Sequence, residues 1–187
     1  MKNILRTVFD NIFWPAAAGN VFWSFCNVVI DPQSGALGVA SKLLILILLS
    51  IYLTISWLRF RVAKGDQSYV GWAFDFLHLW AIVFAALATQ IAPEWLEKLL
   101  ATYFIVTALG HVSGHWKLPE DERYLSIKLA TINLSGVLVL LVGEYFELPD
   151  EIILPGSFAL VFVLWLFLGR WKEILRVDEK LANQNIR

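Results

Sequence analysis

The feature that most restricts how this chain can fold is a series of six apolar stretches, each long enough to cross a lipid bilayer. They are about 19 to 24 residues long and cover residues 12–30, 36–58, 69–92, 95–116, 124–146 and 152–171. A helix rises about 1.5 Å per residue, so each stretch can span a hydrocarbon core about 30 Å thick. The sequence therefore predicts an all-α fold, a polytopic transmembrane bundle of six helices.

The first stretch gives the weakest signal of the six. Asn20, Ser24 and Asn27 interrupt it, and Pro15 lies near its start. A bundle of five spans would result if this stretch lay along the membrane surface. That alternative would leave the basic amino-terminal residues outside the cell, which the distribution of the other basic residues disfavours.

The composition agrees with a membrane protein. Hydrophobic residues make up 58% of the chain and charged residues 17%, whereas a soluble domain has about 45–50% and about 25%. Because too little polar surface remains to cover a globule, we expect the lipid bilayer to cover it. The single cysteine, Cys26, excludes an intrachain disulfide.

Basic residues fall on alternate connections between the stretches, and this pattern predicts the orientation. If the amino terminus is cytoplasmic, thirteen of the fifteen Lys and Arg residues lie on the inner side, and only Lys42 and Lys98 lie outside. The acidic residues divide more evenly, nine inside and seven outside. Since Lys and Arg in short loops set the orientation, we expect both termini in the cytoplasm and the bacterial inner membrane as the location. This orientation accounts for the basic loops, so we predict no nucleic-acid binding.

The chain is predicted to form one transmembrane domain, residues 1–171, followed by a cytoplasmic tail, residues 172–187. In the tail Ile174, Leu175, Val177 and Leu181 alternate with charged residues, a pattern that predicts an amphipathic helix. Two alternatives follow. The tail is either a frayed extension of the last span or, together with the inner loops, a docking surface for a cytoplasmic protein partner.

Small and polar residues are expected to mark the buried faces, because helices in lipid associate through close packing and interhelical hydrogen bonds. On the third stretch such residues recur every three or four positions: Gly71, Asp75, His78, Ala81, Ala85, Ala88 and Ala92. The fourth stretch has Gly110 and Gly114, and the fifth has Gly136. We therefore expect the third to fifth stretches to form the interior and the second and sixth to face lipid. With so little mass outside the membrane, the chain would gain burial by forming a homo-oligomer.

Ionisable residues are predicted to gather at one level of the inner leaflet. A turn centred near residues 93–95 places His78 level with His111, and Asp75 one turn away, level with the neighbour of His115. The next turn brings Lys128 to the level of His111, and Asn133 lies further along the same stretch. Ionisable residues inside a membrane are costly and indicate function by default. Asp75 with Lys128 is a candidate ion pair, and His78 with His111 a candidate proton-exchanging or ligating pair.

Four interpretations of this cluster stay open. The histidines and Asp75 could form a proton relay or a pH-sensitive gate, since histidine titrates near neutral pH. They could instead ligate Zn²⁺ or a related metal, or two of the histidines could hold a haem. In the structural alternative, the long side chains reach the headgroups and the others satisfy one another by hydrogen bonds. No metal site or cofactor is assigned.

The sequence contains no H-E-x-x-H, Walker, G-x-G-x-x-G or G-x-S-x-G motif, so we predict that the protein is not an enzyme. The leading hypothesis is a small homo-oligomeric channel or carrier with Asp75, His78, His111 and Asn133 along a polar route. The alternative is a membrane anchor, sensor or effector subunit of a larger assembly, such as a stress or phage-defence complex, which binds a cytoplasmic partner.

Overall fold

A computed structural model of the protein describes residues 2–32, 37–62, 69–113 and 120–170, and the regular secondary structure in these ranges is helical throughout. The six long helices are α2 (Trp14–Ile30), α3 (Val39–Val62), α4 (Tyr69–Ile91), α5 (Leu96–Ser113), α6 (Glu120–Tyr145) and α7 (Asp150–Trp165). The shorter elements are α1 (Lys2–Val8), η1 (Phe9–Phe13), η2 (Pro93–Trp95) and η4 (Leu166–Arg170). The all-α prediction is confirmed for these residues. The predicted tail, residues 172–187, lies outside them.

Among the residues that the structure describes, five helices are long and apolar enough to cross a membrane, and this makes the chain a multi-pass membrane protein by length and composition. They are Arg6–Ile30, Val39–Trp57, Trp72–Ile91, Ser126–Tyr145 and Asp150–Leu168. The first stretch is among them, and α5 is the long helix that is not. The weakest span is therefore the fourth, which carries charged residues in its first turn and a histidine in its last.

The first span is longer than the sequence indicated, because α1, η1 and α2 follow one another without a break. Proline removes one helical hydrogen bond and its ring clashes with the preceding turn. The wider π-helical turn at Phe9–Phe13, which ends with the Trp14 N–H bonded to the Phe9 carbonyl, lies immediately before Pro15 and accommodates it. Phe9 also packs its ring against Trp72 of α4, with 4.9 Å between ring centroids. The first span is thus an integral part of the bundle.

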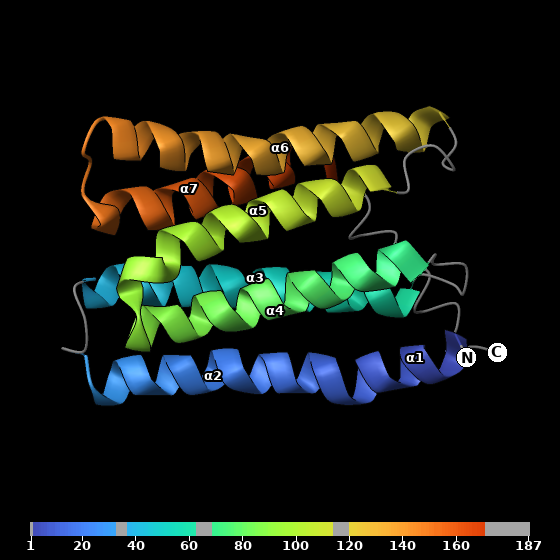
Figure 1. Cartoon of the computed structure of the whole chain (residues 1–187), viewed down its shortest axis with the longest axis horizontal. Helices are drawn as coiled ribbons and strands as arrows, with labels where there is room; N and C mark the ends of the chain where they lie inside the picture. Colours follow the sequence, from blue (N-terminus) through green and yellow to red (C-terminus); the bar gives the residue numbers. More distant parts are fainter. Residues whose placement is uncertain (1, 33–36, 63–68, 114–119, 171–187) are drawn as a thin grey trace.

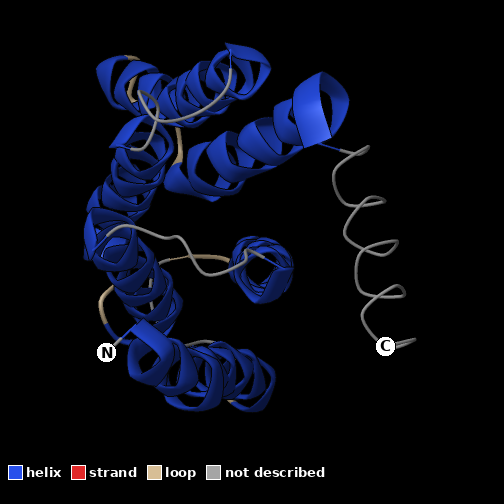
Figure 2. Ribbon diagram, turned by 90° about the vertical axis from the view of Figure 1, so that its right-hand side faces the viewer, coloured by secondary structure: helices blue, strands red, loops and turns tan. Residues whose placement is uncertain are grey.

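The helices are arranged in two layers (Figure 1). In the first layer α2, α4, α5 and α6 lie side by side in that order, and α5 separates α4 from α6. In the second layer α3 packs against α2, α4 and α7, while α7 also contacts α6. Seen end-on, the first layer follows an arc and the other two helices lie on its inner side (Figure 2). Successive helices run in opposite directions, so the start of α1 and the end of η4 lie at the same end of the bundle.

The second layer contributes to the core as well, so the expectation that α3 and α7 face lipid does not describe their inner faces. On α3, Ile45, Leu46 and Leu49 are completely buried, and on α7 so are Phe158 and Val161. Long apolar runs without small or polar residues misled the prediction, because in this bundle large side chains fill the space between the two layers. Small residues are used where two helices approach most closely.

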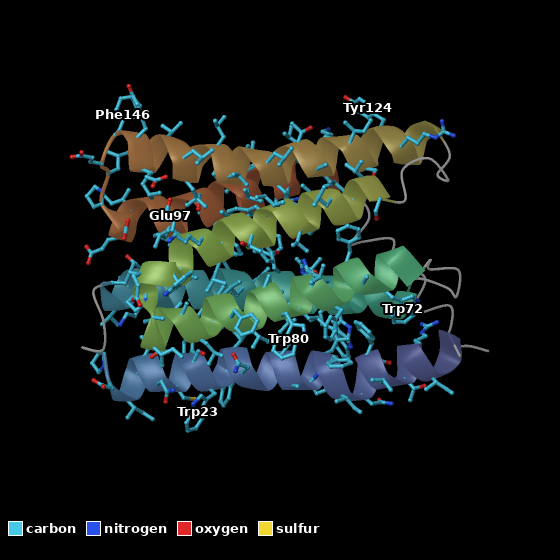
Figure 3. The ribbon with its side chains drawn as sticks, viewed as in Figure 1. Trp23, Trp72, Trp80, Glu97, Tyr124 and Phe146 are labelled. Atoms are coloured by element: carbon cyan, nitrogen blue, oxygen red, sulfur yellow. The ribbon has the colours of Figure 1, made fainter. Side chains whose placement is uncertain are left out.

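The surface of the bundle is rich in large apolar side chains. In Figure 3 Trp23, Tyr124 and Phe146 point away from the helices, and each has more than half of its surface exposed. Exposed aliphatic residues accompany them along the outer faces of α2, α6 and α7, among them Ile30, Leu138, Leu141 and Val163. Such a surface suits lipid rather than water.

A clasp formed by Glu151 joins the first turns of α3 and α7. Pro155 has no N–H, so the Glu151 carbonyl one turn earlier has no partner within α7. The Ser41 hydroxyl from α3 donates to this carbonyl at 2.9 Å. The Glu151 carboxylate in turn accepts the Gly38 N–H, with 3.0 Å from N to Oε1, and so caps the amino-terminal end of α3.

We expect Ser41→Ala to destabilise the protein by about 0.5–1.5 kcal/mol, the usual net contribution of one hydrogen bond. In a Pro155→Ala background the new N–H can satisfy the Glu151 carbonyl within α7, so the same substitution should cost less. Thermal unfolding in detergent of the two single variants and the double variant measures the difference. Ser50→Ala is the control, because that hydroxyl bonds the Leu46 carbonyl of its own helix and should cost the same in both backgrounds. Equal costs for Ser41→Ala in both backgrounds would contradict the clasp.

Candidate functional site: a histidine held by three helices

His78 of α4 lies at the junction of three helices. Its Nδ1 is 3.1 Å from the Thr107 hydroxyl of α5, and its Nε2 is 3.4 Å from the Ser56 hydroxyl of α3. The imidazole ring also lies against the ring of Tyr103, with 5.0 Å between centroids. A single side chain therefore connects both layers of the bundle inside a predicted membrane span.

The hydrogen bonds of Thr107 fix the tautomer of the neutral histidine. Thr107 has one hydroxyl proton, which it donates to the Tyr103 carbonyl at 2.7 Å. Toward His78 it can therefore only accept, so Nδ1 carries the proton. In neutral His78 the Nε2 then accepts the proton of the Ser56 hydroxyl. In the imidazolium form both nitrogens donate, and the Ser56 hydroxyl has to reverse its role.

Aromatic side chains enclose this polar group on the side facing the second layer. Tyr52 of α3 packs edge-on against Tyr103, with 5.9 Å between centroids. Phe158 of α7 contacts both tyrosines, at 5.1 Å and 5.3 Å. The hydroxyls of both tyrosines are buried. The layer around His78 thus combines titratable and hydroxyl groups with a packed aromatic wall.

The register of α4 against α5 differs from the predicted one by about one turn. Gly110 lies against Phe74, with 3.5 Å from the position of a Cβ to the Phe74 Cβ, and His78 faces Thr107. In both pairs the midpoint of the two residue numbers, which marks the turn of the hairpin, falls at residues 92–93 rather than at 93–95. His78 is therefore level with Thr107, not His111, and Asp75 is level with Gly110. The expected direct pairing of His78 with His111 at one level was wrong.

The register of α5 against α6 is close to the predicted one. The Ser126 hydroxyl of α6 donates to the His111 carbonyl, and Gly136 lies against Phe104. Lys128 accordingly lies within about a turn of the level of His111.

Asn133, also on α6, is level with residues 104–107 and so close in depth to His78. It is buried; its amide donates to the Leu129 carbonyl at 2.8 Å, and its Oδ1 has no partner among the described residues. Asn133 therefore adds an acceptor to this layer.

The remaining predicted site residues are placed as follows. Asp75 is half-buried on α4, on the far side of α5 from Lys128, and this arrangement does not support the ion pair between them. Of the packing residues, Ala81 and Ala85 are buried. Gly71 lies in the first turn of α4, which begins at Tyr69, and its packing is not described; His115 and Gly114 lie outside the described residues.

A metal site would need several ligands at one point. Within residues 2–32, 37–62, 69–113 and 120–170, no three His, Cys, Asp or Glu side chains come close enough to hold a metal ion. The described arrangement can do two things chemically. His78 can exchange a proton, and the Ser56 hydroxyl can reverse its hydrogen bond in response, while the bond to Thr107 stays in place.

Sequence reasoning missed the two hydroxyl partners of His78 and the burial of Lys42. Ser56 and Thr107 are ordinary residues of apolar stretches, and only the register brings them to His78. Lys42 was assigned to the outer side as a loop cation, but its side chain is 0% exposed. A lysine three residues inside an apolar run was the available signal. No protein family, curated protein or solved structure matches this chain.

Proposed function

We propose that this protein is a small channel or carrier of the bacterial inner membrane, with both termini in the cytoplasm, in which His78 makes transport responsive to protons. Copies of the chain associate, because almost none of its mass extends beyond the predicted spans. Asp75, His111 and Asn133 contribute further polar groups along the route. The permeating species is small, since the described helices pack closely around His78.

The observation that carries this proposal is the pair of hydrogen bonds to the two ring nitrogens of His78. One runs to Thr107 and the other to Ser56, so the ring links α4 to both α5 and α3. Protonation turns Nε2 from an acceptor into a donor, which changes the contact to α3 and leaves that to α5 in place. A proton can therefore alter how the two layers meet, which is what a gate or an alternating carrier needs.

The test is flux through proteoliposomes that contain the purified protein, measured with monovalent ions and with small neutral solutes between about pH 5 and pH 8, the range in which an ordinary histidine titrates. We expect pH-dependent flux for the parent protein and pH-independent flux for His78→Gln. Glutamine preserves a donor and an acceptor but does not titrate. Asp75→Asn should reduce the flux, because it removes a charge from the polar route.

Thr54→Ala is the matched control. The Thr54 hydroxyl is on α3, as Ser56 is, but it bonds the Ser50 carbonyl of its own helix at 2.8 Å and is exposed. This variant should keep the flux and the pH profile of the parent. An unchanged pH profile in His78→Gln, or the absence of any flux in the parent, would contradict the proposal.

A further inference from the structure

Two tyrosines with buried hydroxyls pack their rings edge-on in the bundle, with 5.9 Å between the ring centroids of Tyr52 and Tyr103. Tyr103 is 0% exposed and Tyr52 is 7% exposed. Neither hydroxyl forms a hydrogen bond among the described residues, and Thr107 lies one helical turn from Tyr103, to whose carbonyl it donates. Two neighbouring helices in different layers therefore present the same unsatisfied group to the same region.

Burial of a hydroxyl without a hydrogen bond is unfavourable, and in a bilayer no bulk water is at hand to compensate. A phenylalanine at either position would have filled the same space without this cost. The rings packed against the two tyrosines are Phe104, Phe158 and Trp165, with the His78 imidazole against Tyr103, and none of these forms a hydrogen bond with either hydroxyl. A ligand shared by the two tyrosines accounts for both hydroxyls at once.

We propose that Tyr52 and Tyr103 bind a water molecule that bridges their hydroxyls. A phenol hydroxyl can both donate and accept, and water offers both roles to each of them. The surrounding rings are in contact with one another, with 5.1 to 5.9 Å between centroids, so a shared ligand has to be as small as water. Buried waters typically make about three hydrogen bonds, and Thr107, which also bonds His78, is the nearest third partner. The water site does not depend on the proposed function. Only a role of this water in proton exchange with His78 would rest on that function.

The experiment is a double-mutant cycle on the full chain, with thermal unfolding of Tyr52→Phe, Tyr103→Phe and the double variant in detergent. Removing only an oxygen keeps the ring packing intact. If the two hydroxyls share one water, each single substitution should lower Tm by about 2–4 °C, because the other hydroxyl loses its bridge. The double variant should lose clearly less than the two single losses together. Tyr124→Phe and Tyr145→Phe are the controls, since both side chains are mostly exposed, and they should leave Tm unchanged.

Any additive result would overturn the water site. If the hydroxyls have no ligand, each substitution relieves an unfavourable burial, so Tm should rise, and the two rises should add. Two independent losses, or no change, would likewise contradict a shared ligand. The flux measurement separates this proposal from the proposed function. If the Tm changes of the two tyrosine substitutions do not add but the parent protein shows no flux, the water site holds and the transport function fails. If the Tm changes add but the flux responds to protons, the transport function holds and the water site fails.

Discussion

Replacing Lys42 with alanine is expected to destabilise the bundle by about 2–5 kcal/mol, the range for truncating a large, completely buried side chain. The Lys42 side chain is wholly buried and takes part in an interaction within the protein. It lies where α3 and α7 begin, at the end of the bundle that also holds Glu97, Glu144 and Asp150. The ammonium group of a buried lysine needs a partner, and the removal of Lys42 also breaks its interaction within the protein.

Thermal or denaturant unfolding in detergent measures this effect. Lys42→Met is the variant that separates charge from volume, because methionine fills most of the space but carries no charge, and it should also be strongly destabilising. Lys98→Ala is the control. Lys98 is exposed, with its Nζ 4.9 Å from the centre of the Trp95 ring, and its removal should cost at most about 1 kcal/mol. A Lys42→Met protein as stable as the parent would show that the charge is not needed.

Gly136→Ala is expected to be the most damaging methyl addition among the described glycines of the first layer. A Cβ at this position would come within 2.7 Å of Phe104 on α5 and of Val161 on α7. Both neighbours are completely buried, so neither can move aside without disturbing the core. We expect a loss of about 1–3 kcal/mol, the range for overpacked cores, and a larger loss for Gly136→Val. Unfolding in detergent measures both.

Gly156→Ala gives the matched control on α7. Nothing lies within 4 Å of a Cβ at Gly156, and alanine is the better helix former by about 1 kcal/mol. This variant should therefore be as stable as the parent or more stable. If Gly136→Ala behaves in the same way, α5, α6 and α7 do not approach as closely as described.

The helices could be predicted from the sequence because a membrane span depends on a single property, a long apolar run, that local composition reports. The first span shows where that property misleads. Ser24 is wholly buried and Asn20 half-buried, so the polar residues that made the span look weak belong to its inward face. The mean hydropathy of a stretch does not distinguish a polar residue that faces the bundle from one that faces lipid.

The candidate site was predicted only in part, because its partners depend on register. His78 was identified from its charge, but Thr107 was not, since the centre of the turn between α4 and α5 was set about two residues late. Ala92 is the residue outside helical geometry, with φ −153° and ψ 61°, and the turn Pro93–Trp95 continues directly into α5. The chain therefore reverses at Ala92. An error in the centre of a hairpin shifts the residue that faces a given position by twice that error. An error of two residues therefore makes His78 face a residue one turn away on α5.

The position of α5 has a consequence for how the protein is made. This helix is the one long helix not apolar enough to count as a span by itself, yet it lies between α4 and α6 and contacts α7 as well. A segment that partitions weakly into lipid gains most from neighbours that cover its polar ends. We therefore expect α5 to insert into the bilayer during synthesis as a hairpin with α4. In a ribosome-bound chain that ends before α6, α5 should be inserted less stably than in the complete protein.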